Sequence, residues 1–65
     1  MGRGFYDSLR AVLVAHACHF VRQARGSHEI WFSPLSQKRF SVPVTVVAKP
    51  TANAILRQAG IHQRL

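Results

Sequence analysis

The stretch RQARGSHEIW, from Arg22 to Trp31, contains the turn on which the fold prediction rests. Gly26 can adopt a positive φ without a steric penalty, so Arg25-Gly26 is a favourable place for the chain to reverse. The segment after the turn, HEIWFS, is rich in residues that favour strands, which predicts a strand over 28–33, and a short strand is predicted before the turn over 20–24. His28 therefore stands directly after the turn, where the second strand begins.

A third strand and a first helix flank this hairpin. The strand is predicted over Lys38–Val47, a long β-branched segment in which Pro43 marks an edge or a bulge. The helix is predicted over Ser8–Cys18, with Asp7 as its N-cap, because apolar residues recur there at helical spacing.

A second helix is predicted to begin at the capping hydroxyl of Thr51 and to end before Gly60, with Ile61 making the apolar contact typical of a glycine-ended helix. The order α-β-β-β-α predicts an α+β fold, a two-layer sandwich with both helices on one face of an antiparallel sheet. Alternation assigns His28, Ile30 and Phe32 to the core face and Trp31 to the open face. The predicted core comprises Leu13, Phe20, Ile30, Phe40, Val42, Ile55 and Leu56.

The composition limits the class of protein. Sixty-five residues form a single domain, residues 1–65, with a small core. Cys18 is the only cysteine, which excludes an internal disulfide and fits a reducing, cytoplasmic location. No signal peptide is visible, and the apolar stretch 11–14 is too short to span a bilayer, so no membrane partner is expected.

The charge balance favours a polyanionic partner. Nine Lys and Arg face two acidic residues, which gives a formal net charge of +7. Nucleic acid and an acidic protein both fit such a surface. Phosphate contacts are predicted for cations near the turn and along the third strand, namely Arg22, Arg25, Lys38 and Arg39. The backbone N–H groups of Gly26 and Ser27 are candidates to hold an oxyanion.

His28 has two interpretations from the residues alone. An RNA strand carries its own nucleophile, the 2′-hydroxyl, and an imidazole with a pKa near ~6.5 can accept its proton at neutral pH. Alternatively, a histidine at the end of the core face caps the core and bonds a carbonyl. The sequence does not indicate a second acid, so water, Lys49 or an arginine-ordered water would have to protonate the leaving group.

Three blocks of sequence carry a resemblance that covers essentially the whole chain. They are GFYDSL at 4–9, FVRQARGSHEIWFSPLSQKRFSVPVTVV at 20–47 and TANAILRQAGI at 51–61. In this order they resemble HicA-type toxins, the mRNA interferases of bacterial toxin-antitoxin systems, and the element order resembles the double-stranded-RNA-binding fold. The resemblance implies an endoribonuclease in which His28 of Gly-Ser-His is catalytic. We expect this enzyme to work without a metal or another cofactor. The resemblance also implies that an acidic HicB-like antitoxin neutralises the enzyme.

One departure from the family pattern lies before the third block. Relatives of this subtype usually carry a basic residue and a histidine there, whereas this chain has Lys49 followed by Pro50. Lys49 keeps the charge for RNA binding. Pro50 is interpreted as a residue that shapes the entry to the second helix, although a missing histidine that contributes to catalysis is the alternative.

Other functions remain as alternatives. A non-catalytic RNA-binding module would have the same fold and charge, and a DNA-binding subunit has no helix-turn-helix spacing to support it. His16, Cys18 and His19 do not have the spacing of a structural zinc site, so no metal is expected. Trp31 on an open face would either contact the antitoxin, together with His28, or stack on a base.

Overall fold

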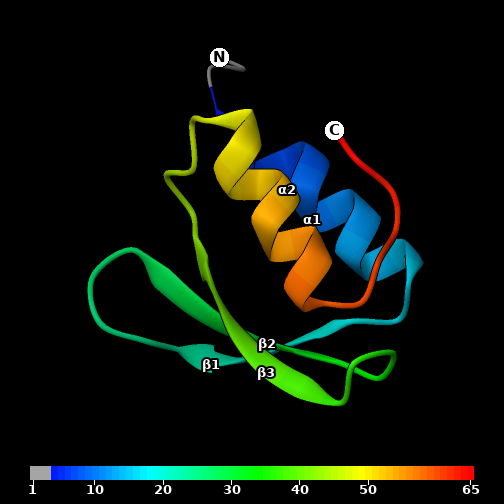
Figure 1. Cartoon of the computed structure of the whole chain (residues 1–65). Helices are drawn as coiled ribbons and strands as arrows, with labels where there is room; N and C mark the ends of the chain where they lie inside the picture. The colour runs from blue at the N-terminus through cyan, green and yellow to red at the C-terminus, as the bar shows by residue number, and fades with distance from the viewer. Residues whose placement is uncertain (1–3) are drawn as a thin grey trace.

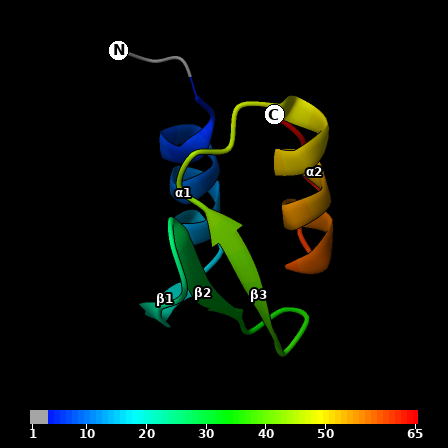
Figure 2. The same ribbon diagram turned by 90° about the vertical axis from the view of Figure 1, so that its left-hand side faces the viewer.

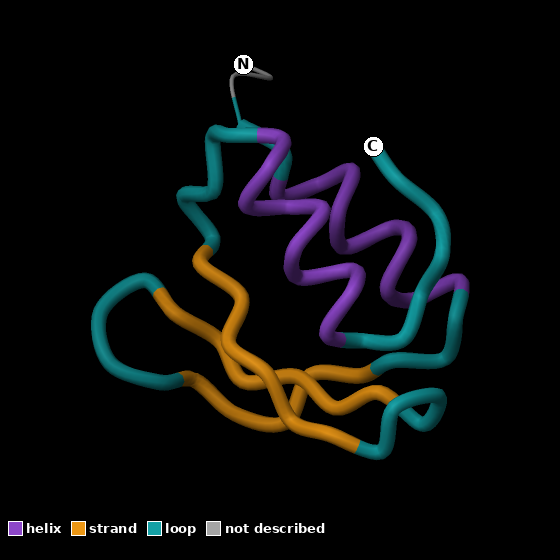
Figure 3. Tube along the Cα trace, in the orientation of Figure 1, coloured by secondary structure: helices purple, strands orange, loops and turns teal. Residues whose placement is uncertain are grey.

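The computed structural model describes residues 4–65, which form two helices and a three-stranded antiparallel sheet (Figure 1). In chain order the elements are α1 (Tyr6–Ala15), β1 (His19–Gln23), β2 (His28–Ser33), β3 (Lys38–Pro43) and α2 (Lys49–Gln58). The strand order is β1-β2-β3. Both helices lie on the same side of the sheet (Figures 2 and 3). The predicted α-β-β-β-α sandwich is confirmed, and it has the order and layers of the double-stranded-RNA-binding fold.

The starts of both helices differ from the prediction. Helix α1 begins at Tyr6 without a side-chain cap, so Asp7 is not the N-cap but lies in the first turn, where its charge complements the helix dipole. Helix α2 begins at Lys49, two residues before the predicted cap Thr51, and also has no side-chain cap. Pro50 occupies its first turn, where the missing N–H costs no hydrogen bond. The structural interpretation of Pro50 therefore has a clear backbone basis.

Both helices end in the same way. Ala17 and Gly60 adopt left-handed conformations, with φ of 66° and 78°. The next residue in each case, Cys18 or Ile61, donates its N–H over 2.9 Å to the carbonyl five residues back. Cys18 and Ile61 are then buried, as expected for the apolar contact that accompanies this motif. The prediction at Gly60 is confirmed, whereas α1 ends at Ala15 and not at Cys18.

The strands keep their predicted places with shifts at the ends. Strand β1 begins and ends one residue earlier than predicted, and β2 has its predicted bounds. Strand β3 stops at Pro43 instead of Val47, because the Pro43 carbonyl accepts the N–H of Val46 over 3.2 Å and closes a turn. The segment after this turn is joined to the start of α1 by a hydrogen bond, in which the Phe5 N–H donates to the Val46 carbonyl over 2.8 Å.

The two faces of the sheet are the reverse of the prediction. His28, Ile30 and Phe32 share a face, but helices do not cover it; His28 is exposed and the other two are half-buried. Trp31 points to the helix side and is 2% exposed, so its predicted place on the open face is wrong. Phe20 and Ile30 are not in the core; Phe20 is 47% exposed.

Polar partners explain how this arrangement buries Trp31. Its indole Nε1 donates to Glu29 Oε1 over 3.0 Å, so burial leaves no unpaired N–H. Ser33 on the same face is fully buried, and its hydroxyl donates to the Ala59 carbonyl over 2.6 Å at the end of α2. The other predicted core residues are confirmed as buried, namely Leu13, Phe40, Val42, Ile55 and Leu56.

Candidate functional site

The turn that carries His28 joins β1 to β2. Gly26 has a φ of 63°, and a Cβ built there would meet no atom within 4 Å, so only the backbone conformation favours glycine. The His28 N–H donates to the Arg25 carbonyl over 3.3 Å, and the Ala24 N–H donates to the His28 carbonyl over 2.9 Å. The turn predicted from the sequence is therefore present, with His28 as the first residue of β2.

This turn is held from two sides. The Gln23 side-chain amide donates to the carbonyls of His28 and Gly26, over 2.9 and 3.3 Å. On the other side, the Val44 N–H donates to the Ser27 carbonyl over 2.8 Å. The backbone of His28 is therefore fixed while its side chain stays exposed. The interpretation of His28 as a core histidine is wrong, because the face that it lies on is the open one.

The strand register arranges the open face in three rows. His28 lies opposite Pro43; Arg22, Ile30 and Ser41 form the next row; and His19, Phe32 and Arg39 form the third. None of these side chains is acidic, and Arg22, His19 and Arg39 are exposed. A basic surface with two half-buried apolar side chains at its centre thus covers the side of the sheet away from the helices.

The rows set which groups can act together with His28. Phe32 is four residues along the strand from His28, which is about 13 Å at ~3.3 Å per residue. Arg39 and His19 lie in that distant row, so their backbone positions are farther from His28 than that of Arg22. Arg22 is one row away, about 7 Å along the strand. Its long side chain can span that distance and bring the guanidinium close to His28.

His19 is the residue on this face that the sequence analysis did not single out as functional. Its ring lies against Phe32, with centroids 5.5 Å apart and planes tilted by 38°. The helix predicted over Ser8–Cys18 puts His19 just after its end, whereas the structure places His19 on β1. A strand starting one residue earlier would have indicated its place beside Phe32.

The other predicted phosphate contacts are divided by the structure. Arg25 lies in the turn beside His28 and is exposed. Within residues 4–65, the N–H groups of Gly26 and Ser27 donate to no protein acceptor, so they remain able to bind an anion. Lys38 begins β3 at the far end of the sheet, opposite Ser33 and about 17 Å along the strand from His28. The structure therefore brings Arg25 to His28 but not Lys38.

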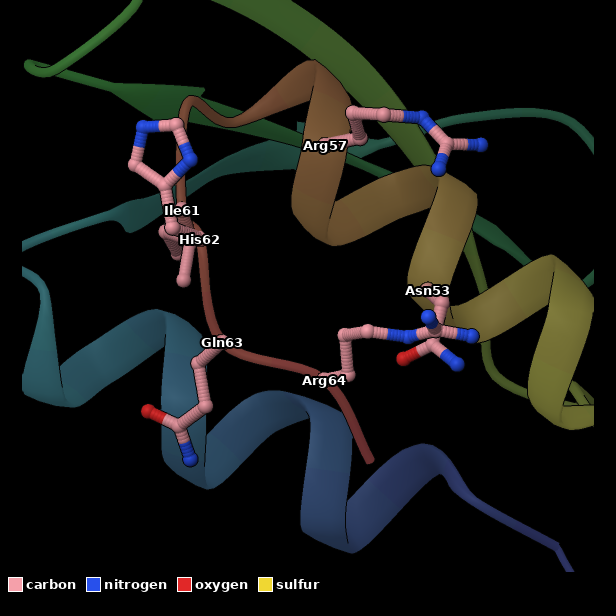
Figure 4. A pocket seen from close by; sticks show the side chains of 6 residues that line it. All are labelled: Asn53, Arg57, Ile61, His62, Gln63 and Arg64. Atoms are coloured by element: carbon pink, nitrogen blue, oxygen red, sulfur yellow. The ribbon is translucent and has the colours of Figure 1, made fainter.

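Lys49 belongs to a different surface, formed by α2 and the C-terminal segment. It lines a hollow together with Arg57 and Arg64. Figure 4 shows an adjoining hollow, lined by Asn53, Arg57, Ile61, His62, Gln63 and Arg64. The Leu65 N–H donates to Asn53 Oδ1 over 2.8 Å, which ties the C-terminal segment to α2. Three cations thus gather on this side, separate from the open sheet face.

The helix side of the sheet holds a polar cluster at the edge near β1. Glu29 Oε1 accepts two hydrogen bonds, one from the Tyr6 hydroxyl over 2.8 Å and one from Trp31 Nε1 over 3.0 Å. Partial burial and then the bond to Glu29 raise the pKa of Tyr6 above its usual value, while Arg10 opposes this rise. Tyr6 is therefore a protonated donor at neutral pH.

The residues that could bind a metal lie apart in the part of the chain that is described. No group of three or more His, Cys, Asp and Glu residues gathers within residues 4–65. His16 Nδ1 lies 2.9 Å from the Val12 carbonyl, at the end of α1, and Cys18 is buried. Neither described helix is long and apolar enough to cross a membrane.

Comparison with protein families assigns the chain to a family. The family described as the HicA toxin of bacterial toxin-antitoxin systems matches residues 6–61. The chain belongs to the HicA toxin family. The match runs from the start of α1 to Ile61 and includes the β1–β2 turn with His28. No curated protein and no solved structure matches the chain.

Proposed function

We propose that this HicA toxin is a metal-independent endoribonuclease that cleaves mRNA on the open face of its sheet, with His28 as the general base. The observation that carries the proposal is the placement of His28. Its carbonyl accepts from Gln23, the carbonyl of its neighbour Ser27 accepts from Val44, and its imidazole is exposed. The imidazole stands at one end of a basic face without a carboxylate. Membership of a toxin family supports the same function.

The chemistry needs only groups that RNA, water and this face supply. Neutral His28 accepts the proton of a 2′-hydroxyl, and the 2′-oxygen attacks the adjacent phosphorus. The bond to the 5′-oxygen breaks, and that oxygen takes a proton from water or from the protonated His28. The products are a 2′,3′-cyclic phosphate and a 5′-hydroxyl. Acid-base catalysis of this kind contributes typically ~10²–10⁴-fold to the rate.

The cations around His28 have distinct parts in this proposal. Arg22 and Arg25 bind the phosphate that is cleaved, together with the N–H groups of Gly26 and Ser27. Arg39 binds a neighbouring phosphate, because its row is about 13 Å from His28. Lys38 and Lys49 lie on other surfaces and bind the RNA backbone farther from the cleaved bond.

The partner that neutralises the toxin is proposed to be an acidic HicB-like antitoxin. An acidic protein lying on the open face would pair with Arg22 and Arg39 and would cover His28. Trp31 is not a contact in this arrangement, since its side chain is buried on the other side of the sheet. A toxin that acts on mRNA and is held by such a partner would act in the cytoplasm.

The experiment compares two variants that each remove one exposed imidazole. His28→Ala should lose about 10²–10⁴-fold in the cleavage rate of a single-stranded RNA. His62→Ala, on the C-terminal segment, should keep the parent rate. Chelation of divalent cations should leave the rate unchanged, and the new 3′ ends should carry cyclic phosphate. Both variants should unfold within ~0.5 kcal/mol of the parent, because neither side chain is buried.

The second candidate is an RNA-binding module without catalysis, which the fold and the charge also support. It predicts RNA binding with a steep salt dependence and no cleavage by the parent chain. Cleavage by folded His28→Ala at the parent rate would refute the role of His28. Cleavage that stops only after removal of metal would refute the metal-independent mechanism.

A further inference from the structure

Glu29 is one of only two acidic residues in the chain, and its carboxylate is fixed on the helix side of the sheet. Tyr6 and Trp31 both donate to its Oε1, over 2.8 and 3.0 Å. Within residues 4–65, Oε2 accepts no hydrogen bond. The carboxylate is thus oriented by two donors and retains one oxygen for a third.

A hollow of about 380 Å³ lies beside this carboxylate, lined by Tyr6, Arg10, Phe20, Glu29 and Trp31. It lies where α1 meets β1, the edge strand of the sheet, and β2. The Phe20 ring stands edge-on to the buried indole of Trp31, with centroids 6.4 Å apart and planes at 83°. Phe20 is 47% exposed, so an aromatic surface remains available at the hollow.

Arg10 adds the opposite charge to the same hollow. It lies one helical turn after Tyr6, so both side chains project from the same face of α1. The hollow therefore combines an aromatic ring, a carboxylate that accepts and a guanidinium that donates. A flat ring can stack on Phe20, donate a hydrogen bond to Glu29 and accept one from Arg10. The hollow therefore fits a flat, polar ring that has a donor and an acceptor on its edge.

We propose that this hollow binds a nucleobase of the RNA, and that it selects bases with an exocyclic amino group over uracil. The base lies against Phe20, donates its amino group to Glu29, and accepts from Arg10 at a neighbouring ring nitrogen or oxygen. Cytosine, adenine and guanine offer such an amino group beside an acceptor. Uracil offers only a ring N–H that lies between two carbonyl oxygens, and these oxygens repel a carboxylate that approaches the N–H. The inference rests on the proposed function, because it takes RNA as the ligand.

The position of the hollow connects it to the cleavage site. Glu29 follows His28 in β2, and their side chains point to opposite faces of the sheet. Because β1 is an edge strand, an RNA strand on the open face can pass around this edge and place a base close to the cleaved bond in the hollow. Base selection there would give the toxin a preference for certain cleavage sites.

The test uses the single tryptophan as a reporter, with the four uncharged nucleosides as probes. Cytidine, adenosine and guanosine should change the Trp31 fluorescence with saturation. Uridine should bind at least about tenfold more weakly, because it has no amino group for the Glu29 carboxylate. Phe20→Ala should weaken the binding of all four nucleosides, because each of them stacks on the Phe20 ring. Glu29→Gln should abolish the preference over uridine, because the amide carries no charge and offers a donor of its own. Val47→Ala, which shortens an exposed apolar side chain between β3 and α2, is the matched control and should leave binding unchanged.

A second measurement separates this inference from the proposed function. Cleavage of an RNA of mixed sequence by the parent chain should favour particular bases, and folded Phe20→Ala should reduce that preference. If the nucleosides bind as predicted but RNA is not cut, the nuclease function fails and the base site stands. If RNA is cut while uridine binds as well as the others, or while no nucleoside gives a saturable signal, the base site is refuted.

Discussion

Ser33 joins the two layers through one fully buried hydroxyl, and removing it should destabilise the fold strongly. The hydroxyl donates to the Ala59 carbonyl over 2.6 Å and accepts the N–H of Leu35 over 3.2 Å. Ser33→Ala leaves both backbone groups without this partner. An orphaned buried polar group costs about 1–3 kcal/mol, so we expect the free energy of unfolding to fall by about 2 kcal/mol.

Thermal and urea unfolding monitored by circular dichroism would measure this change. For a domain of this size, ~1 kcal/mol corresponds to ~4–8 °C, so Tm should fall by about 8–16 °C. Ser41→Ala is the matched control, because Ser41 is exposed on the open face and should change the free energy of unfolding by at most ~0.5 kcal/mol. At a temperature where Ser33→Ala is folded, RNA cleavage should proceed at the parent rate, since Ser33 is five residues along the strand from His28.

Two results would refute this reasoning. If Ser33→Ala and Ser41→Ala change Tm equally, the buried hydroxyl does not hold α2 against the sheet. If Ser33→Ala stays folded but loses cleavage as His28→Ala does, the open face near the turn is not the place of the chemistry.

Four further measurements follow from particular residues. Ala17→Gly should raise the free energy of unfolding in urea by about 1 kcal/mol. The Cβ of alanine makes the left-handed φ of 66° sterically unfavourable, and glycine has no Cβ; a loss of stability would contradict this. Folding raises the pKa of Tyr6 above 10.0, so the stability that this group adds is present at neutral pH and is lost as the pH rises past 10.0. In measurements of the free energy of unfolding against pH, Tyr6→Phe should not show this loss. Pro50→His should leave the cleavage rate flat, whereas a tenfold gain, about 1.4 kcal/mol of barrier, would assign this position to catalysis. An acidic antitoxin at ~100 times its Kd should add ~2.7 kcal/mol of stability, and an unchanged Tm at saturation would exclude it as a ligand of the folded toxin.

The hairpin and the glycine-ended helix could be predicted because each depends on local chemistry. Gly26 and Gly60 are in the left-handed region, where glycine avoids the steric cost of a Cβ. The end of α1 could not be predicted in this way, since Ala17 takes the same conformation without being glycine. Burial of Cys18 in the core stabilises that turn, and such tertiary contacts do not appear in a local pattern.

The candidate site divides in the same way. Arg22 and Arg25 were predicted beside His28 because they are its neighbours across a short turn. The prediction of Lys38 rests on its place in the third strand, and that of Lys49 rests on the family pattern. The register and the fold separate both residues from His28. His19 was missed because its place opposite Phe32 depends on where β1 begins.

The face that His28 occupies depends on Trp31 and not on the histidine itself. Alternation predicts that His28, Ile30 and Phe32 share a face, and this is confirmed, but it does not determine which face the helices cover. The apolar side chains of Ile30 and Phe32 favour the His28 side as the core when only the pattern of β2 is considered. The helices instead cover the side that carries Trp31. This side buries the large indole, whose N–H donates to Glu29, and it also holds Ser33, whose hydroxyl donates to the end of α2. Because side chains alternate along β2, burial of Trp31 on the helix side leaves His28 exposed on the other side.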